Sequence, residues 1–579
     1  MALQVWLPLN GNLNNQGLTD ITVTNSGATV DNNGKIGKCY SFGTGASGLE
    51  IPSSSMNTFT TECSLSMWLY IVSWNNNYAT FFQAGKGGYS WNDYIFGVLR
   101  IADSSKLCFT ITEGISSSTS SFQTPELSLN TWYHLTFVYK SGHCIIYING
   151  ELYQDYSTSY VPSFSSISKI TLGRSNASTY QTNCKLNDVR IYDHALSPKE
   201  VEVLSRGLVC HYPLNGGGRG GDNLLKNTAD LTLWAKEGGI TTTWDSEKNM
   251  YKIEDSTHTN SRWGIYQDIY VEPNSTYTIT VTLDGTACGA GFAVYDSSTS
   301  FPPAVISTTG RQSYTLTSGA NSTKARVYLY TNCGVGKVAW FSLPKVEKSD
   351  HTTPWIPNPA DSAYTAMGYN STTEYDVSGY GNNGTKNGTI TYLTDTPRYN
   401  VSTKIGSTSS YIQIPNLTTT GFSNSYSFAW WGKVPTYTGK MMWGFSDGMR
   451  LNGIFNGNLW NTGDGANNPL YVPGTTTQVT VPTVDVWHHW VMTGDGTTCK
   501  VYQDGVLWAT AKTYKSISGT TIYMNGWDTS TGYTYSEYQM SDFRIYATAL
   551  SDTQVAELYN TAVSVANNGT LMGYELVEV

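Results

Sequence analysis

The chain has 579 residues, which is too long for one hydrophobic core and predicts about three or four domains of roughly 150 residues each. Charged residues make up 13%, below the roughly 25% of typical soluble domains, and tyrosine, tryptophan and glycine are abundant. The net charge of -9 and the lack of a lysine or arginine cluster exclude a surface that tracks nucleic-acid phosphates. The sequence contains no apolar run of about 18 residues, so we expect no insertion into a membrane.

The first predicted element is a strand that starts at the N-terminus. Val5 and Trp6 enter a strand pattern at once, with neither the basic region nor the apolar segment of a signal peptide. We therefore expect no conventional export, unless a leader has been removed. The nine cysteines are scattered and form no C-x-x-C pair, which predicts free, mostly buried thiols. A disulfide between Cys288 and Cys333 is an alternative that the sequence does not decide.

The most informative pattern along the chain is a phrase that occurs twice. Residues 186–197 are LNDVRIYDHALS, and residues 540–551 are MSDFRIYATALS. Earlier landmarks also recur in the same order: an Ile-Pro strand end at 51–52 and 414–415, a tryptophan-histidine strand at 132–134 and 487–489, and an Asn-Gly or Asp-Gly hairpin turn at 149–150 and 504–505. A short helical pattern follows each copy. We infer a duplicated domain.

The middle third of the chain belongs to neither copy. Short alternating strands run from residue 222 to about 357 and predict an all-β sandwich. Just before it, residues 208–216 repeat the chain's own opening strand and its Pro-Leu-Asn-Gly end. We infer that the middle domain is inserted into the second copy after its first strand, and that 208–215 pair with the C-terminal body. The alternative is that these residues form a linker whose Pro-Leu-Asn-Gly matches the opening of the chain by chance.

These motifs, in this order, resemble the concanavalin A-like, laminin-G-type jelly-roll domains. The resemblance predicts an all-β fold: two concanavalin A-like sandwiches plus a smaller inserted β-sandwich. The bounds are 1–206 for the first, 208–216 with 358–562 for the second, 222–357 for the insert, and 563–579 for a C-terminal tail. The insert itself is similar to carbohydrate-binding modules of the jelly-roll kind.

The array as a whole resembles appendage proteins of tailed bacteriophages. That resemblance implies a virion location, synthesis in the host cytoplasm, other virion proteins as partners and a homo-oligomer. It favours a non-enzymatic tail-fibre, baseplate or capsid-surface protein that binds host or environmental glycans, including bacterial surface polysaccharide. The alternatives are a virion structural or decoration protein that binds no sugar, a cellular adhesin and a degraded glycosidase.

Some residues of the repeated motifs have a structural interpretation. Asp188 with Arg190, and Asp542 with Arg544, are two residues apart and are expected to form ion pairs on one strand face. Trp132 and Trp487 are expected to be core residues at a strand start, each followed by a structural histidine. Hydrolysis by this family would need carboxylates at alternate positions of one strand, as in Glu-x-Asp-x-Glu, and the sequence has no such triplet.

The candidate binding residues are aromatic side chains in turn-rich stretches, because aromatic faces stack on the C–H groups of sugars. Those in the sandwiches are Trp74, Trp91, Tyr94, Trp443, Trp460, Trp527 and Tyr533. Those in the insert are Trp234, Trp244, Trp263 and Tyr266, of which at least one is expected to fill its small core. No D-x-D-x-D loop is present, so Ca²⁺ is a possible cofactor without assigned ligands.

Overall fold

The computed structural model describes most of residues 3–560. It leaves out residues 18, 20, 44, 46, 75–76, 89, 91–92, 102–103, 113–118, 178–179, 215–222, 260–261, 297–299, 302–305, 333–334, 349–354, 356–357, 359–360, 362–371, 394, 396, 398–401, 407–408, 437–440, 447–449, 456–457, 464–465, 481 and 527–536. For 119–121, 295–296, 300–301, 392, 441, 450–455, 458–463 and 466–468 it describes the backbone alone.

The N-terminal part is a sandwich of two antiparallel sheets. In spatial order one sheet contains β13 (Glu151–Ser157), β12 (His143–Ile148), β11 (Trp132–Lys140), β6 (Glu62–Ser73), β15 (Asn183–Tyr192), β4 (Cys39–Phe42) and β3 (Thr29–Asp31), with β1 (Leu3–Leu7) also on β15. The other contains β10 (Thr119–Gln123), β9 (Leu107–Thr112), β8 (Tyr94–Arg100), β7 (Thr80–Gly85), β14 (Lys169–Leu172), β5 (Gly48–Ile51) and β2 (Thr24–Ser26).

The C-terminal part repeats this order. One layer contains β39 (Val506–Ala511), β38 (Cys499–Gln503), β37 (His488–Gly494), β32 (Tyr426–Lys433), β41 (Tyr538–Tyr546), β30 (Ser402–Ile405) and β29 (Ile390–Leu393), with β16 (Leu208–Tyr212) on β41. The other contains β27 (Thr373–Glu374), β28 (Gly384–Asn387), β31 (Tyr411–Ile414), β40 (Ile522–Met524), β33 (Met441–Phe445), β34 (Arg450–Phe455), β35 (Asn458–Gly463) and β36 (Ala466–Tyr471).

The repeated motif forms the same local structure in both sandwiches. Asp188 and Asp542 each have a left-handed backbone, with φ of 53° and 56°, at a bulge in β15 and β41. A helix follows each strand, α1 (Pro198–Ser205) and α3 (Asp552–Asn560). Ser197 caps α1 through a capping box with Glu200. Short 3-10 turns lie at Ser53–Met56, Phe164–Ser166, Leu231–Leu233 and Thr420–Phe422.

β16 lies in the sheet of the C-terminal sandwich, although 160 residues separate its last residue from β27 in the sequence. It pairs antiparallel with β41, so that His211 is opposite Arg544. In the N-terminal sandwich β1 pairs with β15 in the same way, with Trp6 opposite Arg190. This is the pairing that the sequence predicted for 208–215, although 215 itself is outside the described residues. The exact domain bounds stay a prediction.

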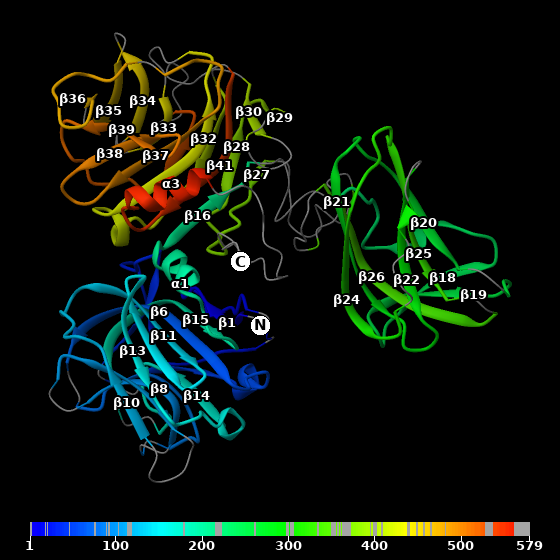
Figure 1. Ribbon diagram of the computed structural model, residues 1–579, viewed down its shortest axis with the longest axis horizontal. Coiled ribbons are helices and arrows are strands. Elements are labelled where there is room, and N and C mark those ends of the chain that lie inside the picture. Colours follow the sequence, from blue (N-terminus) through cyan, green and yellow to red (C-terminus); the bar gives the residue numbers. More distant parts are fainter. Residues whose placement is uncertain are drawn as a thin grey trace.

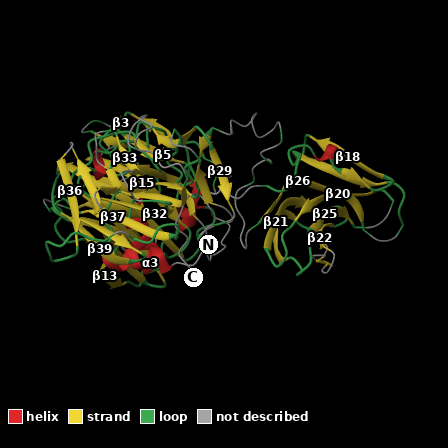
Figure 2. Cartoon of the chain, turned by 90° about the horizontal axis from the view of Figure 1, so that it is seen from above, coloured by secondary structure: helices red, strands yellow, loops and turns green. Residues whose placement is uncertain are grey.

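The middle module contains two five-stranded antiparallel sheets. The first has the order β17 (Ala235–Lys236), β20 (Trp263–Tyr270), β25 (Lys324–Thr331), β22 (Ala290–Asp296) and β23 (Ser300–Phe301). The second has the order β18 (Ile240–Asp245), β19 (Met250–Asp255), β26 (Lys337–Glu347), β21 (Thr276–Asp284) and β24 (Thr309–Thr317). Figure 1 shows this module to one side of the two large sandwiches, and the view from above in Figure 2 agrees.

The two large sandwiches pack on each other, with α1 and α3 near their junction (Figure 1). One apolar cluster contains buried side chains of both, including Trp68 and Leu204 from the first and Trp430 from the second. The ring of Trp6 meets that of Tyr380 edge-on, with centroids 6.0 Å apart. Burial of such large apolar surfaces is the main stabilising contribution at a contact of this kind.

Candidate functional site

The outer face of the β17–β20–β25–β22–β23 sheet carries a group of tyrosines. Along each strand alternate residues point to opposite faces. Ile265 and Leu329 belong to the core between the two sheets of the module. Their neighbours Tyr266, Tyr328 and Tyr330 form a separate cluster with Ala293 of β22. This sheet therefore has apolar side chains on both of its faces.

The positions of these tyrosine rings follow from small residues on β22. A Cβ atom added at Gly291 would lie 2.3 Å from the Tyr330 ring, so only glycine leaves room for that ring. The centroids of Tyr328 and Tyr330 are 5.7 Å apart, and those of Tyr266 and Tyr328 are 6.4 Å apart. Tyr330 is fully buried, Tyr328 is nearly so, and Tyr266 is half-buried. Tyr266 thus presents the accessible ring of the row.

Two arginines lie over this row of rings. The Arg326 guanidinium is 4.1 Å from the centroid of the Tyr266 ring, and that of Arg262 is 5.3 Å from the Tyr330 ring. Arg326 also donates two hydrogen bonds to Asp268, at 2.7 and 3.1 Å. These bonds lower the pKa of the Asp268 carboxyl to about 2. A fixed guanidinium–carboxylate pair beside an aromatic ring supplies both donors and acceptors for hydroxyl groups.

At the start of β20, Trp263 lies on the opposite face of this sheet and packs against the core of the module. The Trp263 ring stacks on His258, with centroids 3.8 Å apart and planes 9° apart. Asp255 holds His258 in place through Nδ1 at 2.9 Å. The backbone N–H of Gly264 donates to Glu237 at 3.1 Å, and burial raises the pKa of Glu237. We call the tyrosine row, the two arginines and Asp268 the β20–β25 cluster.

Of the four predicted residues of the middle module, only Tyr266 belongs to the tyrosine row, because Trp263 lies on the same strand but packs against the core on the opposite face. Trp234 is 4% exposed and packs in the core, so its prediction as a stacking residue is wrong; this fits the expectation that one tryptophan fills the small core. Trp244 is 50% exposed and lies on β18 of the other sheet, 4.8 Å from the ring of Tyr251. It remains a separate candidate.

In the N-terminal sandwich, the structure removes one predicted residue. Tyr94 is 2% exposed, and its hydroxyl is 2.8 Å from that of Thr80, so the ring is a core residue and the prediction is wrong. Trp74 is half-buried, with the Arg100 guanidinium 5.2 Å from its ring centroid. Trp91 lies outside the described residues.

In the C-terminal sandwich, Trp443 is fully buried, 4.3 Å from the ring of Phe428. A stacking role for it is wrong, because β33 lies inside its layer between β40 and β34. Trp460 lies on β35, whose side chains are not described. Trp527 and Tyr533 lie outside the described residues.

The residues with a structural interpretation make specific polar contacts. Arg190 donates to Asp188 at 2.9 Å, and Arg544 donates to Asp542 at 2.7 Å. Trp132 is half-buried and packs 5.4 Å from the ring of Tyr70, whereas the indole N–H of Trp487 donates to Asp395 at 3.0 Å. Both tryptophans are therefore at the edge of the core rather than inside it.

Each histidine that follows these tryptophans is buried. Ser66 Oγ lies 2.9 Å from Nε2 of His134. Burial, with the nearby Arg190, lowers the pKa of His134 to about 3. Because Ser66 and His134 are fully buried, this pair has no access to a substrate and is structural.

Sequence reasoning missed Tyr328, Tyr330, Arg262 and Arg326. A signal for three of them was present: residues 325–330 are ARVYLY, in which Ala, Val and Leu alternate with Arg and Tyr. Alternation gives one face to the core and leaves the arginine and both tyrosines on the other. The pattern predicts the face but not which other strands contribute to it.

The model of the concanavalin A-like lectin/glucanases superfamily matches residues 42–202 and 406–556, which together cover more than half of the chain. The protein belongs to this superfamily. The two matched segments correspond to the two large sandwiches, and the superfamily match does not include the β20–β25 cluster. No match was found among the curated proteins.

Parts of the chain are similar to parts of several solved structures. Domain 4 of AbnA, an extracellular arabinanase from Geobacillus stearothermophilus, solved with arabinotriose, is 19% identical, with 35% of this chain and 98% of that one covered and a TM-score of 0.26. The binding domain of Paraclostridial Mosquitocidal Protein 1 is 16% identical over 47% of this chain and 71% of that one, with a TM-score of 0.29. A Trypanosoma rangeli sialidase mutant with trans-sialidase activity is 15% identical over 35% of this chain, with a TM-score of 0.29. The chain spans about a third of that sialidase, 32%.

Among the described residues, no group of three or more His, Cys, Asp or Glu side chains could hold a metal ion. Ca²⁺ as a cofactor without assigned ligands stays a prediction. Within the same residues no helix is long and apolar enough to cross a membrane.

Proposed function

We propose that this protein is a non-enzymatic glycan-binding protein and that the middle module contacts the sugar through the β20–β25 cluster. The observation that carries the proposal is the row of tyrosine rings on the outer face of β20 and β25, with Arg326 and Asp268 fixed beside the accessible ring of Tyr266. Sugars present C–H groups on a ring face and hydroxyls at its edge. An aromatic ring next to a guanidinium–carboxylate pair complements both.

Binding to Tyr266 requires a movement of Arg326. The guanidinium covers the ring at 4.1 Å without a ligand, and about half of the Arg326 side chain is exposed. A sugar face would take the place of the guanidinium, which would then donate to hydroxyl groups while Asp268 keeps it nearby. The exchange replaces one cation–π contact, worth about 1 kcal/mol at an exposed site, with a stacked sugar and its hydrogen bonds.

A binding role without hydrolysis is supported by the state of the carboxylates between the large sandwiches. Retaining and inverting glycosidases need one carboxylic acid with a raised pKa. Burial would raise the pKa of Glu202, but hydrogen bonds from Arg206, Gln554 and Lys199 lower it. Glu557 shares the same arginine and lysine. Glu202 is therefore a poor proton donor at neutral pH.

For the biological setting we propose a virion surface, as part of a phage tail fibre, baseplate or capsid appendage. The support is the resemblance of the module array and the scarcity of charged residues, 13% of the chain. Partners would be other virion proteins and further copies of this chain. Several weak sites per chain and many copies per particle would bind a polysaccharide with high avidity.

The experiment that tests the proposal is a glycan array that includes bacterial surface polysaccharides, probed with the intact protein. Binding of a defined set of glycans that is lost on Tyr266→Ala supports it. If the folded protein binds no glycan on a broad array, the proposal is wrong, and a structural role through protein–protein contacts becomes the better account.

A further inference from the structure

A pocket of about 770 Å³ lies between the two large sandwiches. One wall is α1 with the β12–β13 turn at Asn149 and Gly150, and the other is the segment from Thr548 to Glu557, which includes the first part of α3. Trp68, Trp132 and Lys35 also line it. The pocket is distinct from the β20–β25 cluster, which lies in the middle module.

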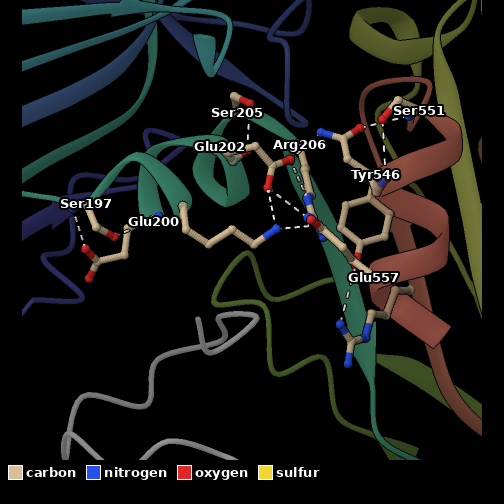
Figure 3. Close-up of polar contacts among 11 residues, drawn as sticks. Ser197, Glu200, Glu202, Ser205, Arg206, Tyr546, Ser551 and Glu557 are labelled. Atoms are coloured by element: carbon tan, nitrogen blue, oxygen red, sulfur yellow. Dashed lines mark hydrogen bonds and ion pairs between the residues drawn. The ribbon is translucent and has the colours of Figure 1, made fainter. Parts of the chain in front are cut away.

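The charged side chains of the walls bind one another (Figure 3). Arg206, which caps the C-terminal end of α1, donates to Glu202 at 2.8 Å and to Glu557 on α3 at 2.7 Å. Lys199 bonds both glutamates, and Gln554 bonds Glu202. The carboxylates of α1 and α3 are thus neutralised by cations from α1. Glu151 also lines the pocket and is exposed.

Two hydrogen-bond donors of the pocket lack a matching acceptor. Trp68 is 3% exposed, and its indole Nε1 has no partner. Lys35 is 9% exposed, its Nζ lies 5.3 Å from the centroid of the Trp68 ring, and its hydrogen bond is a long one of 3.4 Å to the Gly421 carbonyl. Within the described part of the chain, no carboxylate pairs with Lys35. A buried cation without a counter-ion is costly, and so is a buried N–H without an acceptor.

Comparison with the second sandwich explains why the first one has open space over the Trp68 ring. Trp431 in β32 is equivalent to Trp68 in β6. Each tryptophan lies four residues after a serine, Ser427 or Ser64, whose hydroxyl oxygen accepts the backbone N–H of the leucine just before the helix. Tyr559 of α3 stacks over Trp431, with centroids 5.7 Å apart. Counted from the cap residues Ser197 and Ser551, the position of Tyr559 is occupied in α1 by Ser205. A small residue therefore stands where the second copy has a ring over its tryptophan.

We propose that this pocket binds a saccharide that carries a carboxylate, which accepts hydrogen bonds from Lys35 and from the indole N–H of Trp68. The two donors need an acceptor, and an anion also supplies the missing counter-ion of Lys35. Trp132 and Asn149 then offer a ring edge and an amide to the rest of the sugar. The ligand is a saccharide because of the proposed function, on which this step rests, whereas the requirement for an anion rests on the pocket alone.

The charge state of Lys35 is consistent with this role. Burial lowers its pKa to about 8, so part of the population is neutral under mildly basic conditions. A bound carboxylate favours the ammonium form and raises the pKa. Binding should weaken as the pH rises above about 8, because proton uptake then opposes it. The other charged groups that line the pocket are Glu151, Glu202, Glu557, Lys199 and Arg206.

The test uses the full chain with D-glucuronate and, as the matched neutral probe, D-glucose, by saturation-transfer NMR and calorimetry at pH 7. We expect glucuronate to bind with a Kd on the order of millimolar, as a single weak site would, and glucose at least about tenfold more weakly. Ser205→Tyr should abolish binding by filling the space as Tyr559 does, whereas Ser205→Ala should keep it. Lys35→Met should reduce glucuronate affinity about tenfold or more.

Equal binding of the two sugars, or full binding by Ser205→Tyr, would overturn the proposal, and so would no binding of glucuronate to the folded chain. Trp68→Phe keeps the ring and removes the N–H, so an unchanged affinity there would exclude the indole as donor. Failure here is distinguishable from failure of the proposed function, because Tyr266→Ala leaves this pocket unchanged and Ser205→Tyr leaves the β20–β25 cluster unchanged.

Discussion

Trp6 and His211 occupy equivalent positions in the two large sandwiches. The indole N–H of Trp6 donates to Asp188 at 2.6 Å, and Nε2 of His211 lies 2.9 Å from Asp542. Each aspartate also accepts from the arginine two residues later. A different ring N–H thus satisfies the same buried carboxylate in each copy, which indicates that the carboxylate, rather than its donor, is the essential part of the motif.

The first prediction concerns this carboxylate. Asp188→Asn removes the charge that faces the buried Arg190 and should destabilise the N-terminal sandwich by about 3 kcal/mol, the usual cost of leaving a buried charge unpaired. Thermal unfolding should show a lower midpoint for that transition. Asp155→Asn is the matched control, because its pair with His143 is half exposed and should be worth less than about 1 kcal/mol. Equal effects of the two changes would contradict this account.

The second prediction concerns the pH dependence of stability. His134 has a pKa of about 3 in the folded protein and about 6.5 in the unfolded chain, so the unfolded state binds more protons between these values. Its contribution to stability is present in full above about pH 6.5 and is lost as the pH falls toward 3. His134→Gln keeps a hydrogen bond to Ser66 and removes this titration.

Denaturant unfolding of the wild type and of His134→Gln at several pH values between 3 and 7 checks this pH dependence of stability. The free energy of unfolding should fall less steeply with decreasing pH in the variant than in the wild type. Identical slopes would show that His134 is not buried in its neutral form.

The third prediction concerns the thiols. Of the described cysteines, all except Cys288 are buried, and all eight are free. Burial raises the pKa of Cys39 and Cys184 to about 12, which removes the reactive thiolate. A thiol reagent should modify no cysteine other than Cys288 and Cys333 in the native protein, and all nine in denaturant. Rapid native modification of more than two thiols would contradict the buried positions.

The fourth prediction concerns the contact between α1 and α3. Arg206 is 3% exposed and bonds glutamates of both helices. Arg206→Met should weaken the contact by about 3 kcal/mol, because two carboxylates then face each other with Lys199 alone. Calorimetry should show that the transitions of the two sandwiches move apart. Lys500→Met is the control, since its pair with Asp552 is largely exposed; an equal separation in that variant would exclude a specific role for Arg206.

The fold followed from the sequence where the signal is local. The Asn149–Gly150 and Asp504–Gly505 pairs have the positive φ angles of a two-residue hairpin turn, and the repeated motif fixes the strand and helix that follow. The β16–β41 pairing was also predictable, because residues 208–214 repeat the opening strand. In each case a short stretch of residues decides the structure.

The site was less predictable, because exposure depends on the arrangement of strands. Trp443 lies in the run MMWGF, and its strand is covered on both edges and packed against Phe428, which no local pattern specifies. Tyr328 and Tyr266 become neighbours only through the β20–β25 register. The space over Trp68 depends on Ser205, 137 residues later, and on the second sandwich.

The placement of the sugar is tested by the affinity of the intact protein for a glycan identified on the array, compared among the wild type, Tyr266→Ala and Tyr314→Ala. Tyr314 is an exposed tyrosine on the edge strand β24 of the other sheet, so its variant controls for general effects of losing a surface ring. The account predicts about a tenfold loss for Tyr266→Ala and no change for Tyr314→Ala. Equal affinities of all three proteins would contradict the placement of the sugar on the β20–β25 cluster.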